Sequence, residues 1–271
     1  MCRIIGVISA EPVKVTHYLI NAECSLFNQA VKGKQGDGWG IGWYVDRSLE
    51  VYKSEKAVYD EVEVFKHVVG AISSKIVVAH VRKASNPKNL PREEIIGWEN
   101  SQPFWYRRRV FAHNGVLRIP DEVESMLGEY RDLIKGRNDS EVYFTLFMRE
   151  WDLLRDVAQA LRSLEEALWK ALEKAVNNYP SPYSSLNAVF SDGEKLYAYN
   201  RYSTEKKIIS LKSLCYRDEP YYEMSFLPTE NILIVASEKL WKSSEWRKLS
   251  NGELLTAWIE DGKIRFRIEK I

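Results

Sequence analysis

The chain begins with Met1-Cys2-Arg3-Ile4-Ile5-Gly6-Val7-Ile8-Ser9-Ala10, and this segment sets the core of the fold. Residues 3–9 are apolar and largely β-branched, a pattern that predicts a buried strand. The run is too short, and Glu11-Pro12 follows it too closely, for a signal peptide or for a membrane span of about 20 apolar residues. We therefore expect a core strand that begins directly behind Cys2.

Cys2 is either a small core residue or a nucleophile. If Met1 is removed, Cys2 carries both a thiol and a free α-amino group, whose unperturbed pKa is about 7.7–8.0. The amino group can then act as the base for the thiol of the same residue. A terminal cysteine alone is weak evidence, so this interpretation depends on the rest of the sequence.

Composition narrows the class of protein. The chain has 271 residues, 45% of them hydrophobic, and its 39 basic residues nearly balance 38 acidic ones, for a net charge of +1. Proteins that coat nucleic acid or anionic membrane need a basic excess, so neither partner is expected. Because no repeat, low-complexity tract or linker divides the sequence, we expect one domain over residues 1–271.

The three cysteines, Cys2, Cys24 and Cys215, are few and widely spaced. They predict neither a disulfide framework nor a structural zinc site, and no metal or other cofactor is expected. Cys24 and Cys215 are expected to be ordinary residues in a reducing, cytoplasmic setting.

The predicted elements are strands with one helix, then helices, then strands. Apolar spacing predicts a helix over residues 14–31 and a helical segment over residues 139–177. Further buried strands are expected at residues 76–79, 110–112 and 231–236. Two hairpin turns are expected, at Ser191-Asp192-Gly193 and at Glu260-Asp261-Gly262. This order predicts an α+β fold rather than a regular βαβ repeat.

A glycine-rich segment, residues 36–45, leads into another strand. Its glycines alternate and lack the G-x-G-x-x-G spacing that lets a backbone cradle pyrophosphate. Close packing of a glycine face against another layer is the expected role.

Polar residues follow the strand at residues 76–79. A guanidinium binds carboxylates in a two-pronged geometry, so Arg82, with Ser85 close behind it, could hold a carboxylate. An ordinary strand end with a solvated arginine is an equal alternative.

Asn114 and Gly115 follow the strand at residues 110–112. The side-chain amide of Asn114 and the backbone N–H of Gly115 could donate to one oxygen, as in an oxyanion hole. Asn-Gly is also a strong turn signal, and a tight turn would aim both donors. His80 and His113 are expected to be structural.

The helical half opens with Asn138-Asp139-Ser140-Glu141. A helix N-cap explains these residues well, because acidic groups are stabilised at a helix N-terminus. The carboxylate of Asp139 could instead pair with the ammonium group of an amino-acid substrate.

Taken in order, these segments resemble the glutaminase domain of class II (N-terminal nucleophile) glutamine amidotransferases, and most of all their stand-alone YafJ-like subgroup. The resemblance rests on Met1-Cys2-Arg3, Gly36-Asp37-Gly38-Trp39-Gly40-Ile41-Gly42, Ala79-His80-Val81-Arg82-Lys83-Ala84-Ser85, Asn100-Ser101-Gln102-Pro103-Phe104, His113-Asn114-Gly115, Asn138-Asp139-Ser140-Glu141 and Ala236-Ser237-Glu238. It implies a four-layer αββα Ntn-hydrolase sandwich, with two antiparallel sheets between helices.

The resemblance also implies a role for each candidate residue. Cys2 would be the nucleophile that forms a γ-glutamyl thioester, and its α-amino group would be the base. Asn114 and Gly115 would hold the oxyanion. Arg82 would bind the substrate α-carboxylate and Asp139 the α-amino group, with Ser85 as a helper.

A glutaminase of this kind implies a partner, because the sequence contains no P-loop and no segment for a phosphosugar. The ammonia acceptor would be a separate synthase subunit. Two alternatives remain open, namely a hydrolase of another γ-glutamyl amide and a non-catalytic module of the same fold.

Overall fold

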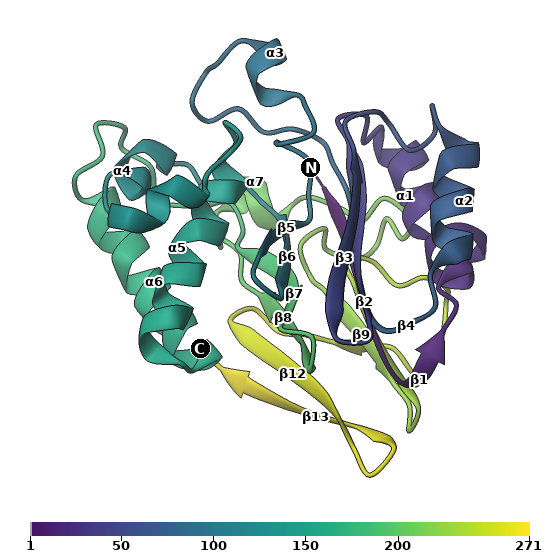
Figure 1. The fold of residues 1–271 in the computed structure, drawn as a ribbon. Coiled ribbons are helices and arrows are strands. Elements are labelled where there is room, and N and C mark those ends of the chain that lie inside the picture. The colour runs from purple at the N-terminus through teal and green to yellow at the C-terminus, as the bar shows by residue number, and fades with distance from the viewer. Residues whose placement is uncertain (1) are drawn as a thin grey trace.

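The computed structural model describes residues 2–271 and shows two antiparallel sheets packed face to face between layers of helices (Figure 1). The strands are β1 (Arg3–Val13), β2 (Trp39–Val45), β3 (Ser48–Ser54), β4 (Ser74–Val81), β5 (Phe104–Tyr106), β6 (Arg109–Asn114), β7 (Asn187–Ser191), β8 (Lys195–Asn200), β9 (Ser225–Pro228), β10 (Ile232–Ala236), β11 (Arg247–Lys248), β12 (Glu253–Glu260) and β13 (Lys263–Lys270). The helices are η1 (His17–Asn21), α1 (Leu26–Gly33), α2 (Val62–Ala71), α3 (Arg92–Ile95), α4 (Pro120–Glu124), η2 (Gly128–Leu133), α5 (Asp139–Leu154), α6 (Val157–Leu172) and α7 (Lys206–Ile209).

The larger sheet, called sheet A here, has the strand order β11-β9-β10-β1-β4-β2-β3, and the smaller one, sheet B, has the order β13-β12-β8-β7-β6-β5. Helices α1 and α2 cover the outer face of sheet A, and α4, α5 and α6 cover the outer face of sheet B (Figure 1). The α+β prediction and the four-layer αββα sandwich are therefore confirmed.

Strand β1 shows why the chain begins with an unbroken apolar run. It lies between β10 and β4 in sheet A, and successive side chains on a strand point to opposite faces. Ile5 and Val7 pack in the core under the helices, whereas Ile4 and Ile8 pack in the core between the sheets. Both faces are buried, so no polar alternation is left in the sequence.

The glycine face predicted at residues 36–45 is confirmed. A Cβ added at Gly42 would lie 2.6 Å from Cγ2 of Val110 on the facing sheet, closer than real carbon atoms approach. Gly6 of β1 is equally tight, because its Cβ would lie 2.5 Å from Cγ1 of Val189. These glycines let the two sheets approach each other.

The single helix predicted over residues 14–31 is wrong. A π-helical turn, η1, ends at Asn21, and α1 starts only at Leu26. The Ser25 hydroxyl caps α1 by accepting from the N–H of Asn28, while the N–H of Cys24 donates to the carbonyl of Leu240. Local capping and a tertiary hydrogen bond therefore interrupt the apolar period.

The helical segment at residues 139–177 is two helices, α5 and α6. Arg155 ends α5 in a left-handed conformation, and Asp156 caps α6 by accepting from the N–H of Gln159. Both predicted hairpin turns are confirmed, since β7 pairs with β8 and β12 pairs with β13.

The expectation that Cys24 and Cys215 are ordinary residues is wrong. They form a disulfide, with Cα atoms 6.1 Å apart and a sequence separation of 191. Cys24 directly precedes the cap of α1, and Cys215 lies in the long connection between α7 and β9. Sequence spacing could not predict this pair, because only the folding of distant segments brings the two residues together.

Candidate functional site

Cys2 lies where the first strand of sheet A begins. Arg3 of β1 is opposite Val81, the last residue of β4, so the antiparallel register places Cys2 beside the segment that starts at Arg82. The Cys2 side chain is buried, with 7% exposure, and its thiol donates to the carbonyl oxygen of Lys83, 3.6 Å from the sulfur. The nucleophile candidate therefore faces the first predicted polar segment.

Arg82 is 2% exposed and is held by the glycine-rich segment. Its guanidinium donates to the carbonyl of Asp37, 3.2 Å away, and its backbone N–H donates to the carbonyl of Gly38. The Asp37 carboxylate in turn accepts from the N–H of Ala84 at 2.8 Å and pairs with Arg92 at 2.5 Å. Asp37 thus shapes the loop behind β4, a role that its place between two glycines did not reveal.

Asp139 begins α5 and is fully buried. The helix cap is its neighbour Asn138, whose side chain accepts from the N–H of Glu141. The Asp139 carboxylate points elsewhere and accepts from the Ser85 hydroxyl at 2.6 Å and from the N–H of Leu117 at 2.8 Å. Capping therefore explains Asn138 but not Asp139, whose carboxylate joins the loop of Ser85 to the loop behind β6.

The charges of Arg82 and Asp139 act in opposite directions on the pKa of the Cys2 thiol. Burial raises the pKa of Cys2, the Arg82 charge lowers it and the Asp139 charge raises it. Burial also raises the pKa of Asp139, while hydrogen bonds from Ser85 and Leu117 and the charge of Arg82 oppose this shift. One cation and one carboxylate therefore act on the same buried sulfur.

Asn114 ends β6 and is 1% exposed. Neither the oxygen nor the nitrogen of its side-chain amide has a hydrogen-bond partner among residues 2–271. Buried amides are normally paired, so the Asn114 amide is available to a group that residues 2–271 do not supply. A Cβ added at Gly115 would overlap the carbonyl oxygen of Ser185, so only glycine fits behind Asn114.

Two histidines, His80 and His113, lie beside the site, and both are fully buried. One nitrogen of His113 contacts the Ser140 hydroxyl and the other contacts the Ser185 carbonyl, each at 2.9 Å. Burial lowers the pKa of His113 to about 4 and lowers that of His80 well below its ordinary value. A positive charge on His113 of β6 would also lower the pKa of His80 on β4, because the ends of these two strands lie close together across the sheets.

The segment Asn100-Ser101-Gln102 aligns the two halves of the site. The Gln102 side chain accepts from the N–H of His113 at 2.7 Å and so fixes the end of β6. The Asn100 side chain accepts from the N–H of Arg137 and from the amide of Asn138, and so fixes the start of α5. No local pattern predicts these contacts, because neither Asn100 nor Gln102 carries catalytic chemistry.

The segment Ser237-Glu238 holds the start of β1. The Ser237 hydroxyl accepts from the N–H of Ile4 at 3.0 Å, and the buried Glu238 carboxylate pairs with Arg3 at 2.6 Å. Among the described residues, Cys24, Cys215 and Glu238 also form a group of metal-ligating types within 4.8 Å of one another, with the two sulfurs already bonded to each other.

No helix in the described part of the chain combines the length and hydrophobicity that a membrane crossing requires. Three curated relatives match nearly the whole chain, and two of them are described here. An uncharacterized protein of Methanocaldococcus jannaschii is 28% identical over 94% of this chain and 68% of its own length. A Saccharomyces cerevisiae protein, named as a probable glutamine amidotransferase, is 24% identical over 94% of this chain and 81% of its own length.

Solved structures show the same fold. A glutamine aminotransferase class-II domain protein from Silicibacter pomeroyi superposes with a TM-score of 0.63 at 20% identity, over 98% of both chains. Glutamine phosphoribosylpyrophosphate amidotransferase from B. subtilis gives a TM-score of 0.61 at 17% identity, over 98% of this chain and 49% of that one. The family model of class-II glutamine amidotransferases matches residues 1–270, and this chain therefore belongs to the class-II glutamine amidotransferases.

Proposed function

We propose that the protein hydrolyses the side-chain amide of glutamine and releases ammonia for an acceptor on a separate protein. The observation that carries this proposal is the pair of buried opposite charges, Arg82 and Asp139, that act on the sulfur of Cys2. Glutamine carries one carboxylate and one ammonium group on its α-carbon. A site with one fixed cation and one fixed carboxylate complements both and would direct the side-chain amide toward the thiol.

In this proposal the Cys2 sulfur attacks the amide carbon, and the carbonyl oxygen becomes an oxyanion that accepts from Asn114 and Gly115. The C–N bond then breaks, and the amide nitrogen leaves as ammonia with the proton of the thiol. Water cleaves the γ-glutamyl thioester to glutamate and restores the thiol. The orphaned amide of Asn114 supports this role, because it is a buried donor with no partner in the described chain.

The thiol needs a base, since burial raises the pKa of Cys2. The α-amino group of Cys2 would be that base once Met1 is removed, because its ordinary pKa lies near neutral pH. Met1 lies outside the described residues. The proposal therefore predicts activity only in chains that have lost Met1.

We also propose that residues 1–271 form one domain, since β1 pairs within sheet A while its inner face packs against sheet B. We further propose a cytoplasmic setting, where a disulfide is usually transient, a separate synthase subunit as partner, and no cofactor. The balanced charge of the chain argues against a nucleic-acid or membrane partner.

The test is ammonia release from glutamine by protein whose loss of Met1 has been verified by intact mass. We expect release by the wild type and none by Cys2→Ser, with asparagine as a control substrate that is one methylene too short. No release, with or without cell extract, would contradict the proposal. A panel of γ-glutamyl amides tests the alternative, and faster cleavage of a larger amide than of glutamine would favour a γ-glutamyl amide hydrolase.

A further inference from the structure

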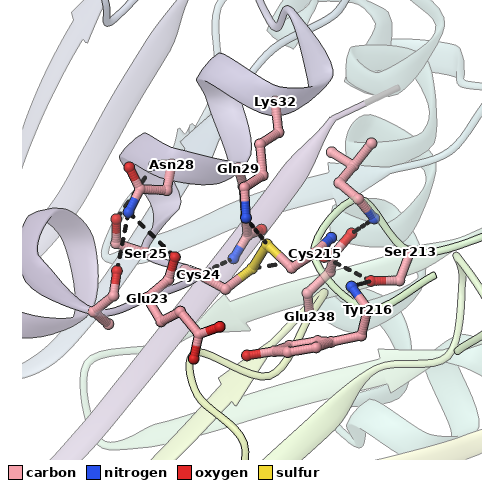
Figure 2. The surroundings of a disulfide bond; sticks show 12 residues. Glu23, Cys24, Ser25, Asn28, Gln29, Lys32, Ser213, Cys215, Tyr216 and Glu238 are labelled. Atoms are coloured by element: carbon pink, nitrogen blue, oxygen red, sulfur yellow. Dashed lines mark hydrogen bonds between the residues drawn. A yellow bond between two sulfur atoms is a disulfide. The ribbon is translucent and has the colours of Figure 1, made fainter. Parts of the chain in front are cut away.

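The Cys24–Cys215 disulfide joins the N-terminal layer to a segment that lies outside both sheets. That segment, residues 210–223, is called the strap here, and it connects α7 to β9. Figure 2 shows the two sulfurs between α1, which carries Gln29 and Lys32, and the strap residues Ser213 and Tyr216. The strap forms no strand of either sheet. It is held by cross-links such as the disulfide and the hydrogen bond from Asn187 to the Tyr222 carbonyl, and by packing of Tyr221 and Tyr222.

Glu238 is the cross-link of the strap that lies beside the disulfide. Its side chain is 1% exposed and lies beside the disulfide, with Oε2 3.6 Å from the sulfur of Cys24 (Figure 2). The carboxylate accepts hydrogen bonds from the Arg3 guanidinium at 2.6 Å, the Ser213 hydroxyl at 2.8 Å, and the backbone N–H groups of Leu214 at 2.6 Å and Cys215 at 2.8 Å. Glu238 therefore ties the strap to the residue that follows Cys2.

The same assembly holds the backbone of Cys2. The Arg3 guanidinium donates to the carbonyl oxygen of Cys2 at 3.3 Å, and the hydroxyl of the strap residue Tyr221 donates to that oxygen at 3.5 Å. The Tyr221 ring also lies over the Arg3 guanidinium, 3.5 Å from the ring centroid. One donor to the Cys2 carbonyl, Tyr221, thus belongs to the strap, and the other, Arg3, contacts the strap through the Tyr221 ring and is linked to it by Glu238.

We propose that the Cys24–Cys215 disulfide is a redox latch on the strap, and that Arg3 and Glu238 are positioning residues through which the latch fixes Cys2. This inference rests on the proposed role of Cys2 as nucleophile. The oxidised latch holds Cys2 in its working position, and reduction by a dithiol loosens the strap, which Glu238 and the other contacts alone hold less firmly, and lowers activity.

The chemistry of the latch follows from its two sulfurs. Cys215 is partly exposed and Cys24 is buried, so a reductant thiolate attacks the sulfur of Cys215. The S–S bond breaks, and Cys24 leaves and takes a proton, which it can donate to Glu238. The second thiol of the reductant then displaces Cys215 as a thiolate, and the reductant departs as its own disulfide. The Lys32 ammonium, 3.6 Å from the Cys215 sulfur, stabilises that thiolate.

The experiment compares glutaminase kinetics of the oxidised and dithiothreitol-reduced full chain, with thiols counted by mass. We expect kcat to fall about tenfold on reduction, equivalent to about 1.4 kcal/mol, with KM unchanged because Arg82 and Asp139 lie on other elements. The double variant Cys24→Ser/Cys215→Ser should have the low kcat in both conditions. Any redox response left in that variant belongs to Cys2. Equal kcat in the two states of the wild type would overturn the latch.

A second readout separates the latch from the proposed function. Alkylation of Cys2 by iodoacetamide, followed by peptide mass mapping after the reductant is removed, needs no glutaminase activity. We expect alkylation about tenfold faster in the reduced chain and in the double variant, because release of the strap opens the buried thiol. Absence of glutaminase activity with this difference retained would overturn only the proposed function. Equal alkylation rates in the two states would overturn the latch.

Discussion

Replacing Asn114 with leucine should lower activity and leave the fold as stable as before or more stable. The side chain is buried, and neither of its amide atoms is paired within the described residues. An unpaired buried polar group costs about 1–3 kcal/mol, which a leucine of similar size would recover. Loss of one oxyanion donor costs about 2.7–4 kcal/mol in the transition state, or about 10²–10³-fold in kcat. Asn114→Leu should therefore keep or raise the free energy of unfolding while it lowers kcat.

Asn187 provides the matched control. It lies directly opposite Asn114 in the register of β6 and β7 and is equally buried. Its side chain accepts from the N–H of Arg201 at 2.8 Å and donates to the carbonyl of Tyr222 at 2.6 Å. Asn187→Leu leaves both of these groups without a partner, so it should destabilise the fold by about 1–3 kcal/mol for each.

The assay pairs urea unfolding with ammonia release from glutamine for both variants. We expect Asn114→Leu to keep or raise the unfolding midpoint and to lose kcat, whereas Asn187→Leu lowers the midpoint. If Asn114→Leu is destabilised as much as Asn187→Leu, the Asn114 amide of the wild type has a hydrogen-bond partner in the folded protein. If it keeps wild-type kcat, Asn114 does not hold an oxyanion, and the reasoning fails.

The other predictions concern the neighbours of Asn114. Arg82→Lys should raise KM for glutamine about tenfold or more, because an ammonium cannot bind a carboxylate in the two-pronged way; an unchanged KM in steady-state kinetics would contradict carboxylate binding. Gly115→Ala should lower kcat and stability together, since its Cβ would overlap the Ser185 carbonyl, and full activity in the ammonia assay would count against Gly115 as a donor. Because burial lowers the pKa of His113 to about 4, the folded state disfavours its protonation. The contribution of neutral His113 to the free energy of unfolding is therefore complete above pH 6.5, and on the order of 3 kcal/mol of it is lost as the pH falls to 4. If urea unfolding of His113→Gln showed the same loss of stability in acid as the wild type, this prediction would be wrong.

The places of three candidate residues could be predicted from residue type and local pattern, while their roles stay predictions. Arg82 and Ser85 follow β4 and Asp139 begins α5, and the fold brings all three together. The double burial of β1 could be predicted in the same way, because a strand covered on both faces has no polar alternation.

Long-range pairing could not be predicted from one sequence. The Glu238 contact with Arg3 spans 235 positions and the Cys24–Cys215 bond spans 191, and no local pattern encodes either. The break between η1 and α1 was missed for the same reason, since the tertiary hydrogen bond from Cys24 to Leu240 helps to interrupt a continuous apolar period. The role of Asp37 depends on the loop of Ala84, which only the fold brings beside it.

The central claim is that Cys2 attacks the side-chain amide of glutamine. Intact mass and peptide mapping after exposure to a diazo-ketone mimic of glutamine test this claim most directly. We predict a chain without Met1 that carries one label, mapped to Cys2, with labelling prevented by excess glutamine and absent from Cys2→Ala. A native chain that keeps Met1 and remains unlabelled, or a label that persists in Cys2→Ala, would contradict the account.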